Sequence, residues 1–99
     1  MSIDLTVTVE AERDIAEAFA WYEERRAGLG EDFLTSLDAS LQGLRRMPEM
    51  PPIAYKTFRR ALIRRFPYAV FYEFEAQQVI VYSVFHTARD PRKWRQRLK

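Results

Sequence analysis

The chain has 99 residues, a length typical of one domain, and 47% of them are hydrophobic, which is enough to form a core. It contains no cysteine, which excludes disulfides and thiolate chemistry. No apolar run approaches the ~20 residues that cross a membrane, and the N-terminus lacks the apolar region of a signal peptide. We therefore expect a single domain over residues 1–99, located in the cytoplasm.

The formal net charge of +2 hides an uneven distribution along the chain. Residues 1–50 contain eleven acidic and five basic residues, whereas residues 51–99 contain three acidic and eleven basic ones. This asymmetry indicates a basic surface that faces a nucleic acid or an acidic protein. The alternative is that the two halves pair their charges across one compact domain.

The first half of the chain predicts one strand and two helices. Apolar and polar residues alternate over residues 3–9, which is typical of a strand with one buried face. Residues 11–26 are rich in Ala, Glu and Arg and predict a helix that ends at Gly28 and Gly30. Residues 31–47 place an apolar side chain every three or four positions and predict a second helix. Two consecutive helices should pack as an antiparallel αα-hairpin.

The second half predicts three strands: residues 58–64 are strand-like but heavily charged, and residues 68–74 and 79–85 are rich in β-branched and aromatic residues. Residues 75–78 suit a four-residue hairpin loop, and a short final helix can follow Asp90 and Pro91. The order β-α-α-β-β-β predicts an α+β fold, with the αα-hairpin packed on one face of an antiparallel sheet and a basic C-terminal tail. The last two strands are apolar on both faces, so we expect the hairpin to cover one face and a second protein the other.

The residue types argue against a metal site or a bound cofactor. The chain has one histidine and no cysteine, and its β half has three acidic residues, too few to predict a converging metal site. Gly28 and Gly30 follow a helix and do not form a phosphate-binding loop. We therefore expect neither a metal nor a cofactor. A lone histidine such as His86 is more often a packing or hydrogen-bonding residue than a catalyst.

The arginines are the informative feature, because guanidinium groups bind phosphates or carboxylates and aromatic rings can stack on bases. The candidate target-binding residues are Arg60, Arg64, Arg65, Arg89, Arg92 and Trp94. The alternative is a solvated basic surface. Trp21 lies off the apolar face of the first predicted helix and is a candidate anchor for a partner, whereas Phe19 and Tyr22 lie on that face and can be core residues.

Two segments resemble the RelE/ParE toxin superfamily: Arg64–Tyr72, which reads RRFPYAVFY, and Val81–Pro91, which reads VYSVFHTARDP. The residues Ala11–Ile15, Trp21, Tyr22 and Phe33 fit the same pattern, so the resemblance covers essentially the whole chain. It implies a toxin neutralised by a cognate antitoxin, in a hetero-oligomer whose antitoxin segment wraps around the helices and the sheet. The antitoxin contacts that we expect are Phe19, Trp21, Tyr22, Phe71 and Tyr82.

Toxins of this superfamily act in two ways. RelE-like members cleave mRNA on the ribosome, and the resemblance places Arg64 at their sheet arginine and Arg89 at a basic tail residue. Their principal catalytic arginine falls at Thr87, which carries no charge to stabilise the transition state, and their tail tyrosine falls near Lys93 or Trp94. ParE-like members inhibit DNA gyrase by protein binding and cleave nothing.

The catalytic arginine and the tail tyrosine of RelE-like toxins have no equivalent in this sequence. The resemblance therefore favours a ParE-like inhibitor of DNA gyrase that is not an enzyme. The alternative is a ribosome-dependent endoribonuclease in which Arg64 and Arg89 contact the scissile phosphate of the mRNA and Lys93 or His86 transfers a proton. A third interpretation is a non-toxic RNA-binding relic of the fold, because fold similarity does not fix function.

Overall fold

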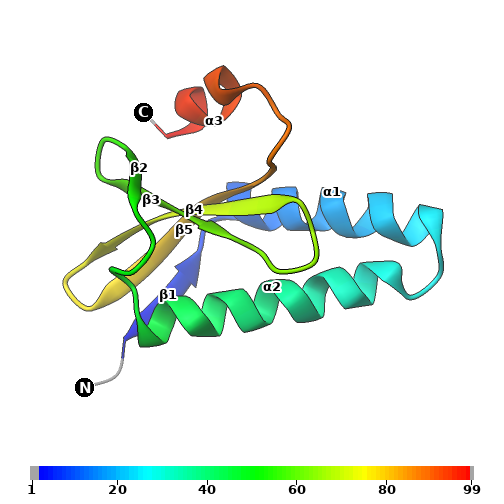
Figure 1. The fold of residues 1–99 in the computed structure, drawn as a ribbon, viewed down its shortest axis with the longest axis horizontal. Coiled ribbons are helices and arrows are strands. Elements are labelled where there is room, and N and C mark those ends of the chain that lie inside the picture. The colour runs from blue at the N-terminus through cyan, green and yellow to red at the C-terminus, as the bar shows by residue number, and fades with distance from the viewer. Residues whose placement is uncertain (1–2, 99) are drawn as a thin grey trace.

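The computed structural model describes residues 3–98, which form five strands and three helices. In chain order these are β1 (Asp4–Val7), α1 (Val9–Arg25), α2 (Leu29–Arg46), β2 (Ile53–Tyr55), β3 (Phe58–Leu62), β4 (Tyr68–Glu75), β5 (Gln78–His86) and α3 (Pro91–Arg97). Figure 1 shows α1 and α2 on one side of the sheet and α3 on the other. The expected fold is confirmed, with β2 as one additional strand and α3 as the helix expected near Asp90.

The strands lie in the order β1-β5-β4-β3-β2 across one sheet. β3, β4 and β5 pair antiparallel, as expected, and the additional strand β2 pairs antiparallel with β3. β1 is the exception, because it runs parallel to β5, with Leu5 opposite Val79. A parallel neighbour requires a long connection, and here that connection contains both helices and three strands. β1 pairs with β5 only as far as Val81, and α1 packs against the rest of β5.

Local hydrogen bonds set where the two long helices begin. The Thr8 hydroxyl accepts a hydrogen bond from the backbone N–H of Ala11 at 3.3 Å, so α1 begins two residues before the expected start. Between the helices Gly28 adopts a left-handed φ of +90°, which favours glycine. The Glu23 carboxylate accepts hydrogen bonds from the backbone N–H groups of Gly28 and Gly30, which satisfies two donors at the start of α2.

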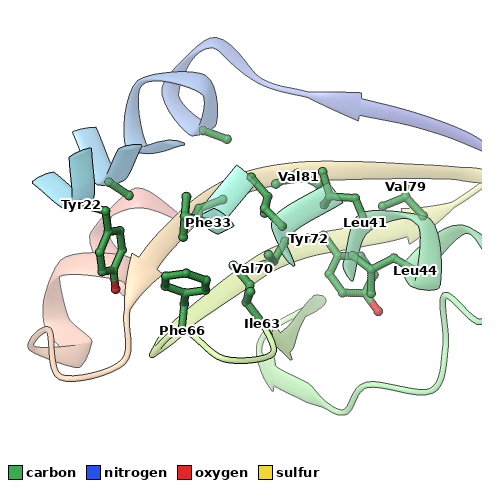
Figure 2. Close-up of a cluster of buried hydrophobic side chains, with 14 residues drawn as sticks. Tyr22, Phe33, Leu41, Leu44, Ile63, Phe66, Val70, Tyr72, Val79 and Val81 are labelled. Carbon is green, nitrogen blue, oxygen red and sulfur yellow. The ribbon is translucent and has the colours of Figure 1, made fainter. Parts of the chain in front are cut away.

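The main core lies between the helical hairpin and the sheet. Phe33 of α2 is fully buried and meets the Phe66 ring edge-on, with 5.4 Å between the ring centroids. The Tyr22 ring of α1 stacks on Phe33 at 5.5 Å, and Figure 2 shows the three rings at one end of the core. Such aromatic pairs add to the stabilisation from burial. The other buried members are Ala11, Ala18, Leu37, Leu41, Leu44, Ile63, Val70, Tyr72, Val79, Val81 and Val84.

A smaller core lies on the opposite face of the sheet, beneath α3. The Trp94 ring of α3 stacks on Phe71 of β4, with 4.6 Å between centroids and 23° between ring planes. Leu98 and Phe85 are buried in the same cluster. The expectation that a second protein must cover this face is therefore wrong, because the chain covers it with its own C-terminal helix. The two-sided apolar pattern of the strands shows that a cover is needed, but it does not show which chain supplies it.

The turn between β4 and β5 is shorter than expected. Glu75 and Gln78 belong to the strands and pair with each other, so only Ala76 and Gln77 remain in the turn. Both have a positive φ, of 52° and 62°. Two left-handed residues match the twist of a tight antiparallel hairpin. Neither is glycine or asparagine, the residues that usually mark such a turn in a sequence, which explains why a longer loop was expected.

Tyr72 joins the sheet to the segment after α2. Its side chain is buried, and its hydroxyl donates a hydrogen bond to the Pro48 carbonyl oxygen at 2.6 Å. Burial raises the pKa of Tyr72 to about 12, although the nearby Arg59 acts in the opposite direction. An unfolded tyrosine ionises near pH 10. The stability that depends on a neutral Tyr72 is therefore fully present below pH 10 and is lost as the pH rises towards 12.

We predict that Tyr72→Phe lowers the free energy of unfolding at pH 7 by about 1 kcal/mol, because one buried hydrogen bond is lost. Between pH 10 and pH 12 the variant should lose roughly 2 kcal/mol less stability than the wild type, because it has no hydroxyl to ionise at this position. Urea unfolding curves of both proteins at pH 7, 10 and 11.5 measure the difference. An equal loss of stability in the two proteins would contradict the assignment.

Candidate functional site

A buried carboxylate on α1 connects three elements of the fold. The Asp14 side chain is 8% exposed, and its two oxygens accept hydrogen bonds from the Arg97 guanidinium of α3 at 2.9 and 3.0 Å. One of these oxygens also accepts from the backbone N–H of Val84 in β5 at 3.0 Å. Arg97 donates a further hydrogen bond to the Tyr82 carbonyl oxygen at 3.3 Å. These side chains thus bind the backbone of β5 where β1 no longer pairs with it.

The sequence carried one signal for this contact that our reasoning missed. Asp14 lies three residues after Ala11 and four before Ala18, and all three are buried on the same side of α1. An acidic residue at an apolar position of a helix must be paired when it is buried, and the basic tail offered many possible partners. Sequence alone could not identify Arg97 as the partner, because that depends on where α3 packs.

A pocket of about 470 Å³ lies beside this network, between α1 and the end of β5. Trp21 forms part of its wall and is 50% exposed, which confirms that this side chain lies off the core. Tyr68 also lines the pocket; burial raises its pKa, Arg89 opposes this and Glu17 reinforces it. The pocket therefore combines aromatic rings with one exposed carboxylate and one exposed guanidinium, a composition suited to holding a side chain of a partner.

The expected antitoxin contacts differ in their accessibility. Trp21 is the most exposed of the five. Tyr82 is half-buried and donates a hydrogen bond to Glu73. Phe19 is half-buried between the helices, where its ring lies so close to Gly30 that a Cβ there would be 2.8 Å away. Tyr22 is buried in the main core, although it lines the pocket. Phe71 is 1% exposed beneath Trp94, so the expectation that it meets a second protein directly does not fit the folded chain.

The expected target-binding residues fall into two groups. Arg60 pairs across the sheet with Phe71 and therefore lies on the side that α3 covers. Arg89 and Arg92 flank the beginning of α3, and Arg92 forms an ion pair with Asp90 at 2.7 Å, which lowers the pKa of Asp90. Trp94 is half-buried on Phe71. The second group, Arg64 and Arg65, is exposed in the turn between β3 and β4.

Within residues 3–98, no hydrogen bond or ion pair joins the side chains of the four residues proposed for mRNA cleavage to one another. The Nδ1 atom of His86 accepts a hydrogen bond from the backbone N–H of Ala88 at 3.0 Å. Arg64, Arg89 and Lys93 have exposed side chains, and the backbone N–H of Arg89 donates a hydrogen bond to the His86 carbonyl oxygen at 3.0 Å. The Arg89 guanidinium lies over the Phe85 ring, 4.9 Å from its centroid.

Residues 3–98 contain no cluster of three or more His, Cys, Asp or Glu side chains placed to hold a metal ion. In the same residues no helix has both the length and the apolar character needed to cross a bilayer.

We predict that Asp14→Ala lowers the free energy of unfolding by about 3 kcal/mol, because it leaves a partly buried guanidinium and a buried backbone N–H without their acceptor. Chemical denaturation measures this change. Glu17→Ala is the matched control, because Glu17 is exposed one turn further along α1, and it should change the stability by less than about 0.5 kcal/mol. Similar stabilities of the two variants would show that the Asp14 contacts contribute little.

Comparison with known proteins agrees with this architecture. Residues 5–91 match the family described as the ParE toxin of the type II toxin-antitoxin system, parDE. The fold is similar to a solved structure described as the chromosomal ParDE TA system from P. aeruginosa, with a TM-score of 0.76 and 11% identity, over 85% of this chain and 95% of that chain. No curated protein matches the sequence. Because the family match spans most of its length, the chain belongs to the ParE toxin family of type II toxin–antitoxin systems.

Proposed function

We propose that this toxin acts by binding DNA gyrase and does not itself cleave a nucleic acid. The observation that carries the proposal concerns Arg64, Arg89 and Lys93. Their side chains are exposed, and within residues 3–98 none forms a hydrogen bond with the His86 side chain, the candidate acid or base. General acid–base catalysis requires a donor and an acceptor within hydrogen-bond reach of one reacting group. His86 is held by the Ala88 backbone, and Trp94 is stacked on Phe71. Exposed guanidinium and ammonium groups are suited to binding an anionic target, and they remain protonated rather than transferring a proton.

The competing function is ribosome-dependent cleavage of mRNA, which one observation favours. Arg64 and Arg89 follow the ends of β3 and β5, two strands that run in the same direction beside β4. The loops that carry them are joined by a hydrogen bond from the Thr87 backbone N–H to the Pro67 carbonyl oxygen at 2.8 Å. Both guanidinium groups therefore lie at one end of the sheet, where they could contact a phosphate.

We expect the purified toxin to stop gyrase from supercoiling a relaxed plasmid, or to cause cleaved DNA to accumulate while gyrase is present. Agarose gels of toxin titrations measure both effects. Normal supercoiling at saturating toxin would contradict the proposal. In a translation extract the toxin should leave mRNA intact. Cleavage at the ribosomal A site that disappears in the Arg64→Ala/Arg89→Ala variant would support the ribonuclease instead.

The proposal includes a cognate antitoxin that binds at the Trp21 pocket. Trp21 is a large, half-exposed side chain, and the Arg25 guanidinium lies 3.8 Å from its ring centroid. Tryptophan and arginine are the residue types that most often dominate the binding energy of protein interfaces. The pocket next to Trp21 would receive an apolar side chain of the antitoxin.

We predict that Trp21→Ala weakens the affinity for the cognate antitoxin by about 30-fold, because truncation of a central tryptophan costs about 2 kcal/mol. Inhibition of gyrase by the free variant should stay unchanged. Val9→Ala is the matched control, because Val9 is an exposed apolar residue of the same helix outside the pocket, and it should keep the wild-type affinity. Calorimetric titration measures both. Equal affinities of the two variants would place the antitoxin elsewhere.

A further inference from the structure

The two outer layers of the molecule carry opposite charge. α1 and α2 together contain nine acidic and four basic residues, whereas α3 contains four basic residues and no acidic one. Residues 53–67, which include β2 and β3, add five basic residues and no acidic one. Among the ion pairs of residues 3–98, only Arg97 with Asp14 joins the two halves of the chain. Of the five basic residues in 53–67, Arg60 lies on the side of the sheet that α3 covers, whereas Arg59 lies on the side of the main core. The charge asymmetry of the sequence is therefore largely a difference between the acidic helical hairpin and the basic α3 on the other side of the sheet.

Five cations define what we call the α3 face, the side of the sheet that α3 covers. Lys93 and Arg95 belong to α3, and Arg60 lies beside Phe71 on this side of the sheet. Lys56 and Arg89 lie over the rings of Tyr55 and Phe85, which belong to the cluster beneath α3. Within residues 3–98 none of the five has a carboxylate oxygen within 4 Å. Two carboxylates that lie near this face have other partners: Glu73 accepts hydrogen bonds from the Thr57 and Tyr82 hydroxyls, and Asp90 is paired with Arg92.

Aromatic rings position several of these cations. The Lys56 ammonium lies 5.2 Å from the Tyr55 ring centroid, and the Arg95 guanidinium lies 5.9 Å from the same ring and 5.2 Å from that of Trp94. A cation above a ring is attracted to it without using its N–H groups as hydrogen-bond donors. The donors on the α3 face are thus held in place and remain available for anionic oxygens.

A phosphate backbone fits this face better than an acidic protein does. Stable protein interfaces have an apolar centre, but Phe71, Phe85 and Leu98 are already buried beneath α3. Of the strand residues on this side, Leu62 at the edge of the sheet is the large apolar side chain that stays exposed. Binding to a nucleic-acid backbone needs clustered cations and no apolar centre.

The same rings favour a duplex over a single strand. Proteins bind single strands by stacking their bases on free aromatic side chains. On the α3 face the Trp94 ring is stacked on Phe71, and the Tyr55 ring meets Trp94 edge-on at 5.9 Å. Neither ring is free to receive a base. A duplex keeps its bases stacked internally and presents phosphates alone.

We infer that the α3 face binds the phosphate backbone of duplex DNA, so that the toxin contacts DNA as well as protein when it acts on gyrase. The inference rests on gyrase as the proposed target. It adds that the basic side of the toxin lies against the DNA segment that gyrase holds, while the acidic helical hairpin points away from it.

The test measures binding of the toxin to a fluorescent 20-base-pair DNA duplex by anisotropy over a series of salt concentrations. The double variant Lys56→Gln/Arg95→Gln removes two charges from the α3 face. Arg13→Gln/Arg46→Gln is its matched control, because it removes two exposed cations from the helical hairpin. The wild type should bind with a dissociation constant of about 1–100 μM, and the slope of log affinity against log salt should fall by about two in the first variant. The affinity of that variant should fall about tenfold, and that of the control less than twofold.

Each other outcome has a defined meaning. Equal losses in the two double variants would overturn the inference, because they would reflect net charge and not the α3 face. Tighter binding of a single strand or an RNA duplex than of the DNA duplex would also overturn it. The inference would also be overturned if the toxin inhibited gyrase but bound no DNA, and if gyrase without DNA bound the wild-type toxin but not the Lys56→Gln/Arg95→Gln variant. If the toxin binds DNA but leaves gyrase activity intact, the proposed target fails while the DNA-binding surface stands.

Discussion

The architecture of this toxin depends on one buried ion pair, between Asp14 and Arg97. β1 is too short to pair with all of β5, so part of the edge of β5 would lack partners for its backbone groups. Asp14 and Arg97 bind the Val84 N–H and the Tyr82 carbonyl oxygen at this edge. The same pair fastens α3 to the sheet. It therefore fixes the element that buries Phe71 and carries much of the basic surface.

Much of the fold could be predicted from local patterns. Alternation identified β1, β-branched and aromatic residues identified β4 and β5, and apolar spacing identified both long helices, because each feature reflects how the element is buried. The parallel pairing of β1 and the strand β2 were not predicted. β1 pairs with a strand more than seventy residues away, and β2 is three residues long beside a proline-rich segment. Neither arrangement leaves a periodic signal in the sequence.

The surface was predicted less completely than the fold. Trp21 was identified as exposed because it falls off the apolar face of its helix. Phe71 was assigned to a partner protein because its strand is apolar on both sides, and only the position of α3 shows that the chain itself covers it. The charge difference between the two halves was visible in the sequence. Its separation onto two sides of the molecule was not, because that depends on helices that lie on opposite faces of one sheet.

Because the chain itself covers both faces of the sheet, the toxin without its antitoxin exposes little surface that could start aggregation. Broad apolar surfaces and long open strand edges are where proteins begin to aggregate. Here the two outermost strands, β1 and β2, have four and three residues, so a strand of another chain could form few backbone hydrogen bonds with either edge of the sheet. The isolated chain therefore exposes little of the surface on which aggregation begins, and α3 would have to leave the sheet before Phe71 and Phe85 were uncovered.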